Sequence, residues 1–199
     1  MSLMKELCST PGVSGFEDKI ADIIEREIKD SVNSIEKDGM GNIIATKKGE
    51  NKKAPTIMLA SHMDEIGLMV KYIDDNGFIK FSKIGGINDQ MLMNQTVVVH
   101  GENGDYVGVI GSKPPHVTKP EERNKVVPYD DMFIDIGAKD KEDAESMVSI
   151  GDSISFKAWF EEFPNDLIMG KALDNRVGCY VMIEVLKRIN TRATVYGIG

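Results

Sequence analysis

The pattern of apolar and polar residues predicts that the chain begins as an α/β layer. After Glu17, isoleucines recur at helical spacing, at Ile20, Ile23, Ile24 and Ile28. Ser14 lies three residues before Glu17, as in a capping box, so we expect Ser14 to cap this helix. Residues 43–46 indicate a strand. Residues 56–60 are apolar on both faces, which predicts a second strand that is buried on both sides.

Residues 67–163 have a different pattern, which is typical of a small β barrel or sandwich. Short alternating or apolar segments are separated by turn signals such as Asp75-Asn76-Gly77. The strands that we expect are residues 68–73, 78–84, 96–100, 106–110, 132–136 and 153–159. Within this stretch only residues 139–148 have a helical pattern.

Two histidines lie in this β-rich stretch. His100 ends one of the expected strands, and we expect it at a surface turn. His116 lies in residues 112–131, which hold four of the seven prolines and are expected to form a long loop. A place near an active-site entrance, a place at an interface and a simple loop role all stay open for His116.

A helical pattern returns after Pro164. Apolar residues at Val177, Val181, Leu186 and Ile189 predict a helix over residues 174–190. Residues 194–198 then indicate another strand, and the sequence ends at Gly199. A helix followed by one strand is an incomplete α/β unit, so we expect this chain to be the N-terminal part of a longer protein.

The composition of the 199 residues argues against several classes of function. With 24 Lys and Arg against 32 Asp and Glu, the formal net charge is −8, which disfavours a nucleic-acid or anionic-membrane partner. No apolar run reaches the roughly 20 residues of a membrane span, and no signal-peptide profile is present. Cys8 and Cys179 are not in metal-ligand spacing and suit a reducing compartment. We therefore expect a cytoplasmic protein.

The first candidate for chemistry is the segment that follows strand 56–60. It contains His62 and Asp64, at the end of a strand, where ligands bind in α/β sheets. A histidine ligand needs its second ring nitrogen held by a carboxylate or carbonyl group, and Asp64 supplies such a partner. The alternative is that His62 is a hydrogen-bonded histidine at a strand end and Asp64 an ordinary loop residue.

The second candidate is Asp174, at the start of the predicted helix. A carboxylate there either caps the backbone N–H groups or coordinates a cation, and both interpretations stay open. We expect Asn175 and Arg176 to be orienting or surface groups. Gly178, inside the helix, is expected to permit close packing on the sheet.

Five motifs with a characteristic order and spacing span nearly the whole chain. They are Pro11-Gly12-Val13-Ser14-Gly15-Phe16-Glu17, Asp38-Gly39-Met40-Gly41-Asn42, His62-Met63-Asp64-Glu65-Ile66-Gly67, Gly111-Ser112-Lys113-Pro114-Pro115-His116 and Lys171-Ala172-Leu173-Asp174-Asn175-Arg176-Val177-Gly178. In these motifs the sequence resembles the N-terminal part of the TET-type co-catalytic metallo-aminopeptidases. This family is also known as deblocking or glutamyl aminopeptidases, and its members were formerly labelled endoglucanases.

The resemblance implies a fold and an assembly. It implies an α/β domain with a zinc-peptidase-like mixed sheet and flanking helices, formed by residues 1–66 and 164–199 and incomplete here. Residues 67–163 would be an inserted, β-rich, PDZ-like barrel domain for dimerisation and assembly. The expected partners are a peptide substrate and other copies of the chain, with dimers assembling into a tetrahedral dodecamer.

The resemblance also implies the site. His62 would be a metal ligand, Asp64 the catalytic residue that orients His62, and Asp174 the carboxylate that bridges two divalent ions, zinc or cobalt. The remaining ligands and the catalytic glutamate would lie beyond Gly199, so the 199-residue form would be inactive.

Two other functions remain as alternatives. A glycoside hydrolase of the endoglucanase type needs two carboxylic groups and no metal, and the pair His62 and Asp64 favours a metal site over that arrangement. The third possibility is a non-catalytic oligomerisation or binding module.

Overall fold

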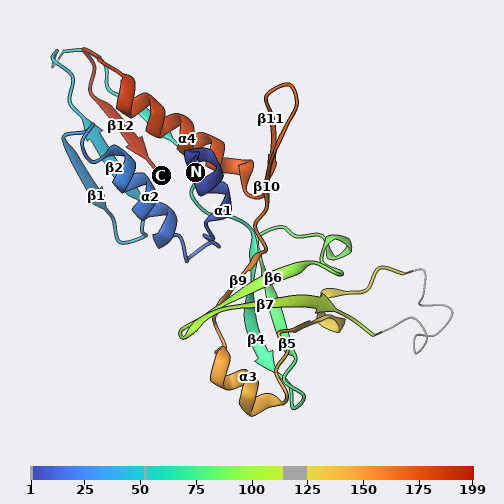
Figure 1. Cartoon of the computed structure of the whole chain (residues 1–199). Coiled ribbons are helices and arrows are strands. Elements are labelled where there is room, and N and C mark those ends of the chain that lie inside the picture. Colours follow the sequence, from blue (N-terminus) through green and yellow to red (C-terminus); the bar gives the residue numbers. More distant parts are fainter. Residues whose placement is uncertain (1, 52, 114–124) are drawn as a thin grey trace. The chain divides into compact units, whose positions relative to one another are not determined.

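The computed structural model describes residues 2–51, 53–113 and 125–199. The chain divides into two compact units, one formed by Met1–Glu65 with Ala158–Gly199 and the other by Ile66–Lys157. The first, the α/β unit, is a mixed α/β structure, and the second, the barrel unit, is a closed barrel. Each unit is described by itself below, with elements labelled as in Figure 1.

A four-stranded mixed sheet forms the frame of the α/β unit. Its elements are α1 (Leu3–Ser9), α2 (Asp18–Ile28), β1 (Ser34–Lys37), β2 (Ile43–Lys47), β3 (Ile57–Ala60), β10 (Phe160–Phe163), β11 (Leu167–Gly170), α4 (Leu173–Arg188) and β12 (Val195–Ile198). The strand order is β1-β2-β12-β3, and β10 pairs with β11 as a separate hairpin. Strand β12 is antiparallel to β2 but parallel to β3, so the last two strands end at the same edge of the sheet.

The isoleucine pattern of α2 is confirmed, but the predicted cap is wrong. Ile20, Ile24 and Ile28 are fully buried in the core of this unit, together with Leu186 of α4. The helix begins at Asp18 with Glu17 as its N-cap residue and without a side-chain cap. The hydroxyl of Ser14 instead donates a hydrogen bond to Asp64, which lies 50 residues away in the sequence.

One prediction about burial in this unit is also wrong. Strand β3 was expected to be buried on both faces, but Met58 is 64% exposed, because β3 is the edge strand of the described sheet and pairs only with β12. In α4, Val177 and Val181 are exposed, while Cys179, Met182 and Ile183 face the core. Since α4 carries apolar residues on both faces, the periodicity alone could not select the buried one.

The barrel predicted from the alternating segments is confirmed. Its elements are β4 (Gly67–Ile73), β5 (Ile79–Ile84), β6 (Thr96–Gly101), β7 (Gly104–Gly111), β8 (Phe133–Asp135), β9 (Ser153–Phe156) and α3 (Lys141–Met147), with short 3-10 helices at Asp89–Met91 and Tyr129–Asp131. The strands close in the order β4-β5-β8-β7-β6-β9. Leu68, Val97, Ile134 and Ile154 are among the fully buried residues of its core.

Some details of the β-rich stretch need correction. Residues 160–163 were assigned to the β-rich domain, but they form β10, which pairs with β11 of the α/β unit. His100 is not at a surface turn: it lies on β6, with Nδ1 2.8 Å from Asp105 Oδ1 and Nε2 2.9 Å from Ser155 Oγ. Of the expected loop 112–131, residues 129–131 form a 3-10 helix. Residues 114–124, including His116, lie outside the described residues.

No helix in the part of the chain that the structure describes is both long enough and apolar enough to cross a membrane. Both cysteines, Cys8 and Cys179, are buried and free.

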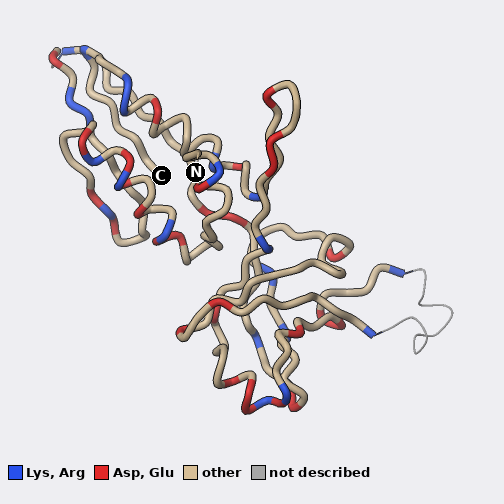
Figure 2. Tube along the Cα trace, viewed as in Figure 1, with Lys and Arg blue, Asp and Glu red and all other residues tan. Residues whose placement is uncertain are grey.

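An exposed ion cluster joins α1, α2 and α4, where acidic and basic positions are interspersed (Figure 2). Arg26 contacts Glu6 at 2.8 Å and Glu27 at 3.0 Å, and Lys187 contacts Glu27 at 2.8 Å. The Arg26 guanidinium holds the pKa of Glu6 below its usual value, and the Lys187 ammonium with Arg26 does the same for Glu27. These carboxylates therefore stabilise the fold above pH about 4.5, and the contribution is lost as the pH falls through their lowered pKa values.

We expect Arg26→Met to lower the free energy of unfolding by about 0.2–1 kcal/mol at pH 7, the range of exposed ion pairs. The difference from wild type should shrink at pH 3 and in high salt, since protonation and screening both remove the interaction. Urea unfolding at both pH values measures this effect. Lys19→Met, on the same helix but outside the cluster, serves as the control. An equal loss of stability at pH 7 and pH 3 would show that packing rather than charge is responsible.

Candidate metal centre

His62, Asp64 and Asp174 come together at one edge of the sheet. His62 lies two residues after the end of β3, and Asp174 lies in the first turn of α4. His62 Nδ1 is 2.9 Å from Asp64 Oδ1, and His62 Nε2 is 3.1 Å from Asp174 Oδ1. The imidazole thus lies between two carboxylates that are 110 residues apart in the sequence, 174 − 64 = 110.

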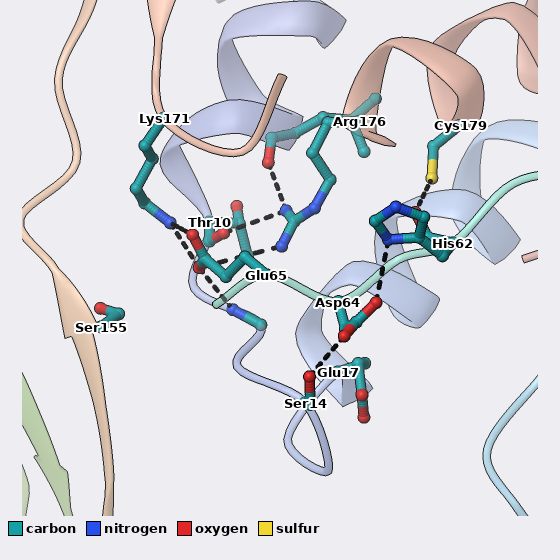
Figure 3. Close-up of polar contacts among 12 residues, drawn as sticks. Thr10, Ser14, Glu17, His62, Asp64, Glu65, Ser155, Lys171, Arg176 and Cys179 are labelled. Atoms are coloured by element: carbon teal, nitrogen blue, oxygen red, sulfur yellow. Dashed lines mark hydrogen bonds and ion pairs between the residues drawn. The ribbon is translucent and has the colours of Figure 1, made fainter. Parts of the chain in front are cut away.

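Asp64 is fixed through both of its carboxylate oxygens. Oδ1 faces His62, and Oδ2 accepts the hydrogen bond from the Ser14 hydroxyl, as Figure 3 shows. The thiol of Cys179 donates to the backbone carbonyl of His62 at 3.3 Å, and burial raises the pKa of this thiol, which keeps it protonated. Asp64 and Cys179 therefore hold the ring and the backbone of His62.

The side of the site that faces Asp174 is open to solvent. The Asp174 side chain is 96% exposed and that of His62 53% exposed. A cavity of about 150 Å³ adjoins His62 and Asp64 and is also lined by Glu17, Met40 and Asn42. Sequence reasoning missed Glu17 and Asn42 as neighbours of the site, although both belong to the quoted motifs.

The donor set fits a divalent metal ion. If Nδ1–H donates to Asp64, His62 Nε2 carries a lone pair that points toward an oxygen of Asp174. The lone pair of Nε2 and a lone pair of the Asp174 oxygen can then share one cation. The alternative is a protonated His62 ring that donates to both carboxylates. Two ligands at 2.0–2.2 Å from a tetrahedral zinc ion lie about 3.3–3.6 Å apart, so the 3.1 Å found here would have to lengthen slightly to admit the ion.

His62 and Asp174 do not complete a site by themselves. Within the ranges 2–51, 53–113 and 125–199, no group of three or more His, Cys, Asp and Glu side chains is placed to hold a metal ion. A catalytic zinc ion usually takes three protein ligands. The chain therefore presents two candidate ligands and an orienting carboxylate.

A buried ion cluster lies beside the site and was not anticipated from the sequence. Glu65 follows Asp64 and binds Lys171 Nζ, at 2.5 and 2.6 Å for its two oxygens. Arg176 is 0% exposed, so its interpretation as a surface group is wrong. Burial lowers the pKa of Lys171, an effect that Glu65 opposes.

Gly178 lies close to the Asn175 side chain. An added Cβ would meet Asn175 Oδ1 at 2.4 Å, and the predicted packing of Gly178 on the sheet stays a prediction. That oxygen accepts a hydrogen bond from the Gly178 N–H at 3.0 Å. Asn175 therefore supports the turn that carries Asp174.

Comparison with known proteins assigns the chain to a family. The family model of the M42 glutamyl aminopeptidases matches residues 41–199. FrvX of Escherichia coli (strain K12), a protein provisionally named as an aminopeptidase, is 40% identical over an alignment of 202 positions that covers 100% of this chain and 56% of FrvX. The chain belongs to the M42 glutamyl aminopeptidase family, and the resemblance seen in its motifs is confirmed.

Solved structures agree with this assignment. The TET aminopeptidase from the marine sediment archaeon Thaumarchaeota archaeon SCGC AB-539-E09 superposes with a TM-score of 0.95 at 39% identity, over 100% of this chain and 58% of that protein. Pyrococcus horikoshii TET1 peptidase, which can assemble into a tetrahedron or a large octahedral shell, has a TM-score of 0.88 at 37% identity, over 98% of this chain and 59% of that protein. The chain thus spans little more than half the length of these relatives.

Proposed function

We propose that this chain forms part of a metal-dependent aminopeptidase that removes N-terminal residues from peptides. The observation that carries the proposal is His62, held between Asp64 and Asp174 at the edge where β3 and β12 end. Membership of the M42 family supports the reaction class.

In this proposal each of the three residues has a distinct role. His62 Nε2 and the Asp174 carboxylate would hold the metal, and Asp174 could serve two ions because it has two oxygens. Asp64 accepts the Nδ1 proton of His62, which fixes the tautomer and leaves Nε2 free to bind. When bound, two divalent ions such as zinc or cobalt lower the pKa of water and polarise a peptide carbonyl.

The remaining groups are proposed to come from sequence that this chain does not span. Its relatives are almost twice as long, and a co-catalytic pair needs further ligands and a glutamate that carries the proton to the leaving amine. The barrel unit, by analogy with the oligomeric TET1 peptidase, is proposed as a PDZ-like assembly domain for a homo-oligomer.

The proposal predicts that the 199 residues alone lack peptidase activity. Two protein ligands are fewer than the three that a catalytic zinc ion usually takes, and the proton-carrying glutamate is proposed to come from sequence that this chain does not span. The assay uses aminoacyl-p-nitroanilides with added zinc or cobalt, with P. horikoshii TET1 peptidase as the positive control. The extended protein, which joins this chain to the part of FrvX that the match leaves uncovered, should show turnover that a chelator abolishes.

The outcomes separate the proposal from its alternatives. Turnover by the 199 residues equal to that of the extended protein would contradict the ligand-count argument. Hydrolysis of a β-glucan that survives chelation would indicate a glycoside hydrolase, an alternative that the family assignment does not favour. Oligomers without turnover in the extended protein would indicate a binding or assembly module.

A further inference from the structure

The residues next to both halves of the candidate site belong to one buried ion cluster. Glu65 follows Asp64 in the sequence, while Lys171 and Arg176 lie on either side of Asp174. The side chains of Glu65, Lys171 and Arg176 are 5%, 10% and 0% exposed. Three charged side chains are therefore buried next to residues of a site that is itself open to solvent.

Glu65 joins three segments of the α/β unit. Its carboxylate accepts both contacts from Lys171 and a hydrogen bond from the Gly12 N–H at 3.0 Å. Its backbone N–H donates to Gly12 O at 2.8 Å, and its carbonyl accepts from the Ser14 N–H at 3.3 Å. The loop that carries Ser14, the partner of Asp64, is thus tied to Glu65 on both sides (Figure 3).

Arg176 anchors the segment that carries Asp174. Its Nη1 donates to the carbonyls of Leu7 at 2.5 Å and Thr10 at 3.1 Å, and its backbone N–H donates to Ala172 O across the Asp174 turn. In the part of the chain that the structure describes, Nε and Nη2 have no hydrogen-bond partner, and Nη2 lies 3.9 Å from Glu65 Oε1. Of these two donors, Nη2 is therefore the one that lies near the Glu65 carboxylate.

Stability alone does not explain such a cluster. A buried ion pair often contributes less to stability than apolar residues of the same size, because desolvation offsets the attraction. The cluster instead restricts positions. The Glu65 carboxylate, next to Asp64, attracts Lys171 and Arg176, which flank Asp174 in the sequence. Among the described residues, the Asp174 side chain hydrogen-bonds only to His62, so its position depends on the backbone that flanks it.

We propose that Glu65, Lys171 and Arg176 form a positioning device that sets the separation of Asp64 and Asp174 and thereby aligns the His62 ring between them. These are positioning residues, since none of them reaches the open face of the site. The inference rests on the proposed function where it treats His62 and Asp174 as metal ligands. Its geometric part, the alignment of His62, does not depend on a metal.

The test follows His62 in the 199-residue chain by ¹⁵N NMR of the ring nitrogens, first without metal and then during a zinc titration. Lys171→Met removes one arm of the cluster, Lys171→Arg restores a cation, and Glu65→Gln removes the central charge. Lys187→Met is the matched control. It removes a 2.8 Å contact between Lys187 of α4 and Glu27 of α2, outside the buried cluster of Glu65, Lys171 and Arg176. If Glu65→Gln does not fold, Lys171→Met still decides the matter, since it leaves one buried anion with one buried cation.

We expect Lys171→Met and Glu65→Gln to shift the His62 ring signals and to weaken zinc binding about 10- to 100-fold, as changes behind a ligand usually do. Lys171→Arg and Lys187→Met should stay within about twofold of wild type. Unchanged ring signals and zinc affinity in folded Lys171→Met would overturn the inference. If the wild-type 199-residue chain binds no measurable zinc, the metal-free ring signals alone support or refute the positioning role. The proposed function is then decided separately, by chelator-sensitive turnover of the extended protein, because its further ligands are proposed to lie outside this chain.

Discussion

Replacing His62 with alanine in the extended protein is expected to lower peptidase activity by about three orders of magnitude or more. His62 is the only nitrogen ligand that we propose in this chain, and its loss leaves Asp174 without a partner on the shared cation. Added zinc or cobalt should not restore the rate. The measurement is kcat/KM on an aminoacyl-p-nitroanilide at several metal concentrations.

A matched control for this substitution is His100→Ala. His100 is also bound by a carboxylate and a second polar group, at 2.8 and 2.9 Å, but it lies on β6 of the barrel unit. We expect activity within about twofold of wild type, because a histidine bound in this way contributes to stability and not to the reaction. Equal losses for His62→Ala and His100→Ala would indicate general destabilisation and would remove His62 from the metal assignment.

Much of the fold could be predicted because its signals are local. The isoleucines of α2 repeat at 3.6-residue spacing on one face, so their burial follows from the sequence alone. The barrel strands alternate between core and exterior and are separated by turns such as Asp75-Asn76-Gly77. Each of these patterns is complete within about ten residues.

The errors arose where a distant partner decides the outcome. Ser14 has the spacing of a helix cap, but a carboxylate 50 residues away takes its hydroxyl. Met58 belongs to an apolar strand, yet its exposure depends on which strands lie beside β3. The residues around Ser14 and Met58 in the sequence do not indicate either the distant carboxylate or the neighbouring strands.

The candidate site was predicted only in part for the same reason. His62 and Asp64 are two residues apart at a strand end, and Asp174 is a carboxylate at the start of a predicted helix. Glu65 and Arg176, in contrast, are charged residues within the five sequence motifs, and charged residues are rarely buried without partners. Nothing local indicates that Glu65 meets Lys171, 106 residues later.

Removing different members of the buried ion cluster is expected to destabilise the fold by different amounts. Glu65→Leu leaves two buried cations without an anion and the Gly12 N–H without its acceptor, so we expect a loss of about 3–5 kcal/mol in the free energy of unfolding. Lys171→Leu should cost less, because Glu65 keeps its hydrogen bond from Gly12 and lies 3.9 Å from Arg176. Urea unfolding of the 199-residue chain measures both changes.

The double variant Glu65→Leu/Lys171→Leu gives the sharper result. It removes one charge of each sign, so only Arg176 remains as a buried cation, held by the carbonyls of Leu7 and Thr10. We expect the double variant to be more stable than Glu65→Leu alone, with a coupling between the two sites of about 1–3 kcal/mol. Losses that simply add would mean that Glu65 and Lys171 act independently. In that case the unpaired positive charge of Lys171 could not be the source of the instability, and the cluster would not act as one unit.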